Sequence, residues 1–181
     1  RFMTPEKAAY YRLMLMAGLR EQYDHDIDEA LERENPITIP LLDLACHMSD
    51  LNQTISILAD YIVDNKPNEQ QVFSMVVQEL RRLYTDGSLS IKDIIEIMYI
   101  IAKDCETEGN PVWDDFSLLY YDYEMVESNF VSEEQFQQAF ETWLFRGERL
   151  NLWEVIESNQ PQKQNIFADF IRKMFRKEKL L

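Results

Sequence analysis

The apolar residues of this chain recur at helical spacing along nearly its whole length, and this periodicity constrains the fold more than any other feature. Strand-like alternation is confined to Ile37–Ile39. The clearest helical stripe consists of Val72, Phe73, Val76, Val77, Leu80, Leu83 and Tyr84. We therefore expect an all-α fold, an irregular bundle or a stack of helical hairpins, with about eight to nine helices.

Capping residues and prolines, rather than glycines, predict where these helices begin and end. Thr4 precedes Pro5, an arrangement that opens a helix. The segments Ser90–Asp93 and Ser132–Gln135 each have the pattern of a capping box. The segment Ile91–Ala102 is apolar on nearly all sides, so we expect it to lie centrally. We expect one all-helical domain over residues 1–181.

A short basic helix is expected at the end of the chain, at about residues 162–181. Its cations are Arg172, Lys173, Arg176, Lys177 and Lys179, and they flank an apolar stripe. Cations in the last turns of a helix are favoured by its dipole. Docking of this helix on the acidic part of its own chain, or contact with a membrane surface, are the alternatives.

The negative charge of the chain is large and unevenly distributed. The 181 residues include 33 acids and 18 bases, for a net charge of −15. The 42 residues between Lys103 and Arg146 contain no lysine or arginine. They contain eleven acids: Asp104, Glu106, Glu108, Asp114, Asp115, Asp122, Glu124, Glu127, Glu133, Glu134 and Glu141. The same stretch holds ten aromatic residues: Trp113, Phe116, Tyr120, Tyr121, Tyr123, Phe130, Phe136, Phe140, Trp143 and Phe145.

This acidic and aromatic stretch is suited to binding a basic protein. Aromatic rings supply contact area, and carboxylates pair with arginine and lysine. Three consecutive helical residues cannot all face a core, so we expect at least one of Tyr121 and Tyr123 to be exposed. The predicted partner-binding residues are Asp114, Asp115, Tyr121, Asp122, Tyr123, Glu124 and Glu127.

Two other considerations bear on this stretch. Acids on helix exteriors often serve only solubility, and those near helix starts complement the helix dipole, so a merely solvated face is the alternative. Nucleic acid is a poor partner for so negative a surface, because phosphate contact requires lysine and arginine.

The composition offers little material for catalytic or cofactor sites. There are only two histidines and four glycines, which disfavours histidine-rich metal sites and glycine-rich phosphate loops. Among so many acids, no carboxylate pair can be singled out for acid–base chemistry. We predict no catalytic residue, no cofactor and no metal site, and therefore a protein that is not an enzyme.

Two local patterns resemble metal sites but fall short of them. Asp24–Asp28 begins like a calcium loop, yet Glu29 stands where such a loop needs glycine. His47 could join neighbouring acids on one helix face, but a helix boundary at Ser49–Asp50 would break the register. The cysteines, Cys46 and Cys105, lack C-x-x-C spacing, and we expect both to be buried reduced thiols.

No run of about 18 uncharged apolar residues occurs, so no membrane span is predicted. The first residues lack the apolar stretch of a secretory signal. We expect a soluble, cytoplasmic protein.

The order of elements resembles that of the small acidic helical immunity proteins that bacteria pair with polymorphic toxins, including contact-dependent growth inhibition effectors. The resemblance covers the helix Val72–Tyr84, the turn Asp86–Ser88, the segment Leu89–Ile95, and Trp113–Phe116 through Tyr123–Glu124. It implies an acidic, non-enzymatic protein that binds a basic, often nuclease, toxin domain. No binding residue of that diverse family transfers by position.

Three functional hypotheses follow. The first is an inhibitory protein whose acidic aromatic surface covers a basic effector. The second is a helical scaffold or regulatory module that binds a peptide or helix in a groove. The third is an all-α hydrolase with a carboxylate-bound metal, which metal analysis of the purified protein would test.

Overall fold

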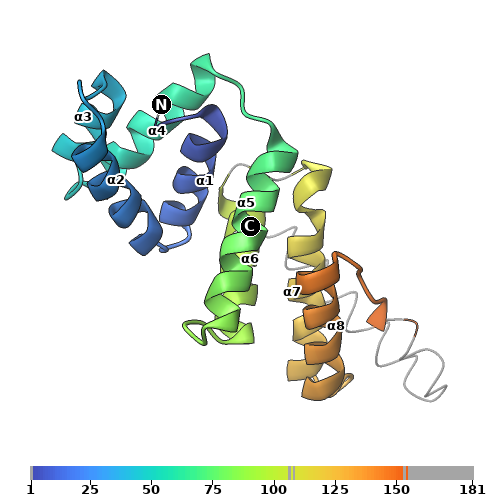
Figure 1. Cartoon of the computed structure of the whole chain (residues 1–181). Coiled ribbons are helices and arrows are strands. Elements are labelled where there is room, and N and C mark those ends of the chain that lie inside the picture. Colours follow the sequence, from blue (N-terminus) through green and yellow to red (C-terminus); the bar gives the residue numbers. More distant parts are fainter. Residues whose placement is uncertain (1, 106, 108, 153, 155–181) are drawn as a thin grey trace. The chain divides into compact units, whose positions relative to one another are not determined.

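The computed structural model describes residues 2–105, 107, 109–152 and 154 of the chain, and within them every regular element is helical (Figure 1). This confirms the predicted all-α fold of about eight helices. The elements are α1 Pro5–Met16, α2 Glu21–Arg33, α3 Ile39–Cys46, α4 Leu51–Asp64, α5 Glu69–Thr85, α6 Ile91–Asp104, the 3₁₀ turn η1 Pro111–Trp113, α7 Asp114–Glu127 and α8 Glu133–Arg146.

The chain divides into two compact units, the first Arg1–Tyr120 and the second Tyr121–Leu181. The first unit holds α1 to α6, η1 and the beginning of α7. The second unit holds the end of α7 and α8. The expected basic helix at about 162–181 lies outside the described residues.

Local capping explains most of the helix boundaries. The Thr4 hydroxyl accepts a hydrogen bond from the Lys7 amide at 3.2 Å, with Pro5 at the first helical position. Both predicted capping boxes, Ser90–Asp93 and Ser132–Gln135, are formed. Gly147 ends α8 in the left-handed conformation, with a φ of 70°. These signals are local, which is why the sequence pattern predicts them.

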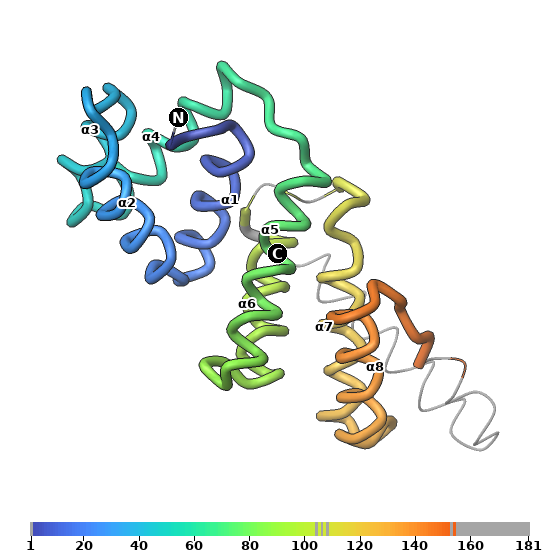
Figure 2. Tube along the Cα trace, viewed as in Figure 1, coloured from blue at the N-terminus to red at the C-terminus, as the bar shows by residue number. Residues whose placement is uncertain are grey.

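Helix α1 is the hub of the first unit, where it packs against α4 and α5 (Figure 2). Seven of its twelve residues are buried. They include the small residues Ala8 and Ala9, which allow neighbouring helices to approach closely. The Tyr11 ring contacts the Tyr10 ring and, edge-on, the Tyr23 ring of α2. Because buried residues occur on several sides of α1, the helix can pack against more than one neighbour.

Helix α6 buries a large part of its apolar segment within the first unit. Six residues of its apolar segment are buried, namely Ile94, Ile95, Ile97, Met98, Ile101 and Ala102. Near them, the Phe73 ring of α5 contacts Trp113 and Phe116 with centroids 5.4 and 5.5 Å apart. The Trp113 indole donates a hydrogen bond to the Glu69 carboxylate at 3.2 Å. These contacts fix η1 and the start of α7 against α5.

The second unit is built on α8 and the end of α7, which lie side by side (Figure 1). Tyr123 of α7 meets Phe136 of α8 in an edge-on contact with centroids 5.2 Å apart. The connection turns at Asn129, whose φ of 58° is left-handed, a conformation that asparagine tolerates better than most residues. The core face of α8 consists of Phe136, Ala139, Phe140, Trp143 and Leu144.

One expectation about the cysteines is wrong. Cys105 is buried as predicted, but Cys46 is exposed. Cys46 is the last residue of α3, a helix of eight residues that buries only Leu41 and Leu44. The thiol therefore falls on the solvent side of the last turn. Both cysteines are free thiols.

Within the described residues, none of the helices combines the length and the apolar character that crossing a membrane requires.

Candidate functional site

The aromatic residues of the acidic stretch serve mainly the interior. Trp113 and Phe116 in the first unit, and Phe136, Phe140 and Trp143 in the second, are all buried. Tyr120 is half-buried and stacks on Tyr99 with ring centroids 4.0 Å apart. Phe145 is the most accessible of the set, with 47% of its surface exposed. Helical spacing alone could not separate these core residues from an aromatic interface.

The two tyrosines expected to signal an interface are both half-buried. Tyr123 packs its ring edge against Phe136, and Tyr121 has neighbours of its own in the structure. Neither ring is fully exposed, so the expectation of an exposed tyrosine is not met. Each tyrosine nevertheless keeps part of its side chain at the surface beside the carboxylates of α7.

Asp122 occupies a different environment from its neighbours, because its side chain is only 1% exposed. Its Oδ2 accepts a hydrogen bond from a terminal nitrogen of Arg149 at 3.1 Å, and the Arg149 side chain is 25% exposed. A buried carboxylate requires such a counter-charge to offset its lost hydration. Asp122 thus ties the chain after α8 to α7, and in this structure its carboxylate faces the interior rather than a partner.

The remaining predicted carboxylates lie at or near the surface. In the first unit, Asp114 is exposed and Asp115 is half-buried, both in the first turn of α7. In the second unit, Glu124 is half-buried and Glu127 is exposed. The structure therefore places the first two residues and the last two residues of the predicted site in different units.

Helix α8 adds carboxylates that the predicted site omitted. Glu133 and Glu134 are exposed in its first turn, where the helix dipole favours negative charge. Hydrogen bonds from the Glu134 backbone amide and from the Ser132 hydroxyl lower the pKa of the Glu134 carboxyl. Glu141, half-buried, accepts a hydrogen bond from the Gln137 amide at 2.8 Å. These groups extend the negative surface of the second unit.

Three possible metal ligands lie together on α2. One ligand atom each from His25, Asp26 and Glu29 falls within 4.8 Å of the others. Asp26 already accepts hydrogen bonds from Tyr11 at 2.5 Å and from Gln22 at 2.7 Å. Glu29 forms an ion pair with Arg33 at 2.6 Å. A metal ion would have to compete with these partners, and the calcium-like segment Asp24–Asp28 is continuous helix.

The second metal-like pattern is taken up by local structure. His47 Nδ1 lies 2.8 Å from the Asp43 carbonyl oxygen. The helix boundary predicted at Ser49–Asp50 is present, since Asp50 caps α4 by accepting a hydrogen bond from the Gln53 amide at 3.0 Å. These side chains have structural roles at the junction of α3 and α4.

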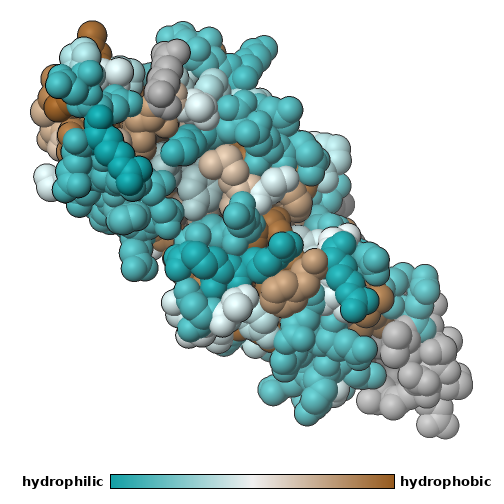
Figure 3. Space-filling view, viewed as in Figure 1, coloured by the Kyte–Doolittle hydropathy of each residue, from teal (hydrophilic) through white to brown (hydrophobic). Residues whose placement is uncertain are grey.

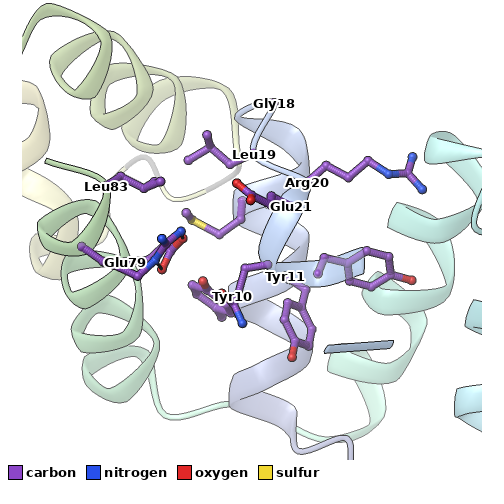
Figure 4. A pocket seen from close by; sticks show the side chains of 12 residues that line it. Tyr10, Tyr11, Gly18, Leu19, Arg20, Glu21, Glu79 and Leu83 are labelled. Atoms are coloured by element: carbon purple, nitrogen blue, oxygen red, sulfur yellow. Dashed lines mark hydrogen bonds and ion pairs between the residues drawn. The ribbon is translucent and has the colours of Figure 1, made fainter. Parts of the chain in front are cut away.

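Two cavities in the first unit could hold a ligand or a partner side chain. One, of about 300 Å³, lies between α1, the start of α2 and α5 (Figure 4). The other, of about 260 Å³, lies between the N-terminus, α3 and α4, with Leu44, Ile57 and Tyr61 among its walls.

The visible face in Figure 3 is mainly hydrophilic, with hydrophobic residues gathered near α3. Three of the exposed large hydrophobic residues, Ile37, Ile39 and Leu42, are close in sequence there. They are close in sequence to Pro40, Asp43 and Leu44, which line the second cavity.

Comparison with known protein families, with curated proteins and with solved structures found no match to this chain.

Proposed function

We propose that this protein is a non-enzymatic binding protein that neutralises a basic protein partner, as an immunity protein does with a bacterial toxin. The observation that carries the proposal is the concentration of carboxylates on α8 and on the end of α7. Arg149 forms an ion pair with Asp122. The described residues of the second unit contain seven other carboxylates and one further cation, Arg146. Besides Asp122, these acids are Glu124, Glu127, Glu133, Glu134, Glu141, Glu148 and Glu154.

Such a surface carries a cost and offers an advantage. Like charges on neighbouring helices repel and lower the stability of the fold, while their field attracts a basic partner and raises its association rate by roughly 10- to 1,000-fold. The half-buried Tyr121 and Tyr123 supply ring surface beside Glu124 on α7. Tyrosine is among the residues that contribute most to binding at interfaces.

Charge reversal tests the proposal. The variant Glu124→Lys/Glu127→Lys changes the net charge by about +4 on the last turns of α7. A basic toxin domain encoded by a neighbouring gene would be the partner to use, in a pull-down followed by a Kd measurement. We expect affinity to fall by at least about 10-fold, which corresponds to about 1.4 kcal/mol.

A matched control separates position from total charge. The variant Asp28→Lys/Glu32→Lys makes the same change at two exposed positions of α2. Affinity should be nearly unchanged in this control. Equal losses in both variants, or none in either, would show that these carboxylates do not form the binding surface.

A second candidate function is a helical scaffold that binds a peptide or helix in a groove. The cavity beside α3 and α4 supports it, since Ile57 and Leu44 line that cavity and Ile39 and Leu42 are exposed nearby. For this function, Ile57→Ser would weaken binding, while Glu124→Lys/Glu127→Lys would leave it unchanged. High salt would have little effect on the affinity of such an apolar contact.

A further inference from the structure

The cavity between α1 and α5 combines apolar walls with ionised groups. Met14 and Leu19 form part of its apolar lining, and Tyr10 lines it from α1. Figure 4 shows Glu79 reaching from α5 toward Tyr10. A volume of about 300 Å³ is at the small end of ligand sites, enough for one side chain or a small molecule.

The guanidinium of Arg82, which also lines the cavity, lies among an excess of carboxylates. It donates two hydrogen bonds to Glu79, at 2.7 and 2.9 Å, and one to Asp86 at 3.0 Å. Hydrogen bonding to Glu79, followed by the charges of Glu79, Asp86 and Glu21, raises the pKa of Arg82. Three carboxylates around one cation leave the local charge negative.

The other cation of the lining, Arg20, also has partners within the protein. Arg20 forms an ion pair with Asp24 at 2.6 Å and donates a hydrogen bond to the Met48 carbonyl. Neither arginine is therefore available to bind an anion without losing a carboxylate partner. The lining itself carries two arginines and two glutamates, and the carboxylates of Asp24 and Asp86 beside them leave the surroundings of the cavity negative, which favours a cationic ligand over an anionic one.

The hydroxyl of Tyr10 is an unused polar group in this cavity. Tyr10 is only 6% exposed, and among the described residues none forms a hydrogen bond with its hydroxyl. Burial, followed by the charges of Glu79 and Asp26, raises the pKa of Tyr10, so the phenol stays protonated. A hydroxyl that lines the cavity without a partner can donate a hydrogen bond to a bound group or accept one from it.

We propose that the cavity between α1 and α5 is a recognition pocket for a cationic side chain, arginine or lysine, of a basic protein. This inference rests on the proposed function, because it supplies an anchoring site for the same kind of partner. Glu79 and Glu21 provide negative charge, and the Tyr10 hydroxyl accepts a hydrogen bond from the bound cation. The tyrosine rings add the attraction of an aromatic face for a cation within about 6 Å.

The test uses the full chain labelled with ¹⁵N and a probe that carries one side chain, N-acetyl-arginine methylamide. An NMR titration should give saturable shifts at Tyr10, Leu19 and Leu83, with a Kd on the order of millimolar for so small a ligand. The lysine analogue should bind at the same residues. The uncharged norleucine analogue should bind at least about fivefold more weakly, because it cannot pair with a carboxylate.

Two variants probe the pocket itself. Glu79→Gln removes the charge, and Tyr10→Phe removes only the hydroxyl and keeps the ring. Each should weaken the arginine probe by about three- to tenfold. The control Glu96→Gln, an exposed position of α6, should leave the Kd unchanged. If Glu79→Gln alters the fold through Arg82, the Tyr10→Phe titration still decides the question.

Shifts that do not saturate, equal affinity for the norleucine analogue, or wild-type affinity in both folded variants would overturn the inference. Its failure is distinguishable from failure of the proposed function. Partner binding that depends on Glu124 and Glu127, without saturable probe binding, would refute only the pocket. Partner binding that ignores those glutamates would refute the proposed surface, whatever the probe does.

Discussion

Replacing Arg149 by methionine should destabilise the protein more than replacing any exposed charged residue of α8. Asp122 is 1% exposed at its side chain and its Oδ2 lies 3.1 Å from Arg149. Removing one member of a buried ion pair typically costs about 3–5 kcal/mol, because the other charge stays buried without its counter-charge. Arg149 is 25% exposed, so water reaches part of the pair. We therefore expect a loss near the lower end, about 3 kcal/mol.

Urea denaturation followed by tryptophan fluorescence measures this loss. With a denaturant dependence of about 2 kcal/mol per molar urea, the midpoint should fall by about 1.5 M. The control Arg146→Met removes an exposed arginine at the end of α8 and should change the free energy of unfolding by less than about 0.5 kcal/mol.

A double-mutant cycle identifies the cause. Asp122→Asn combined with Arg149→Met removes both charges, so it should be less destabilised than the sum of the single variants, by about 1–3 kcal/mol. Arg149→Met with wild-type stability, or additive effects in the cycle, would refute the assignment of Arg149 as the counter-charge of Asp122.

Three further predictions concern stability and thiol chemistry. Burial raises the pKa of Tyr23 to about 12, whereas the unfolded chain should have a value of about 10. The protonated Tyr23 therefore contributes to the free energy of unfolding below pH 10, and this contribution is lost as pH rises toward 12. Urea midpoints measured from pH 9 to 12 should fall less steeply in Tyr23→Phe than in the wild type, and parallel curves would contradict this. Cys46 should react with a thiol reagent in the native protein, whereas Cys105 should react only on unfolding, a difference that mass spectrometry after timed labelling can check. Ser132→Ala removes the capping box of α8 and should lower the free energy of unfolding by about 1 kcal/mol, measured by thermal or urea denaturation. The control Ser56→Ala, at an exposed position of α4, should leave the free energy of unfolding almost unchanged.

The parts of the fold that the sequence predicts are those set by neighbouring residues. Thr4 with Pro5 and the capping box at Ser132 both act within one helical turn. Apolar spacing of 3.6 residues likewise identifies the buried faces of α5 and α8. Both kinds of information are local, so they do not depend on how distant segments pack.

The environment of the predicted site could not be predicted in the same way. Asp122 and Arg149 are separated by 27 positions, so nothing in the local pattern marks this carboxylate as buried. The neighbours Glu124 and Glu127 keep surface positions although all three share one helix. Which acids remain at the surface is decided by packing of α7 against the chain that follows α8.

The cavity beside Tyr10 was equally hidden in the sequence. Tyr10 and Glu79 stand on helices α1 and α5, and only the packing of these helices brings both side chains to one cavity. The position of α1 as the hub of the first unit was also missed, because its apolar residues surround the helix instead of forming one stripe. Tertiary contacts of this kind have no counterpart in periodicity.

The salt dependence of the association rate constant tests the central claim most directly. Stopped-flow mixing of the protein with the adjacent toxin domain should show the rate constant falling at least about 10-fold between about 20 mM and about 500 mM salt, because ions screen long-range attraction. Glu124→Lys/Glu127→Lys should lower the rate at low salt and flatten this dependence. A rate constant that is independent of salt and of these two glutamates would contradict a function based on the acidic surface of the second unit.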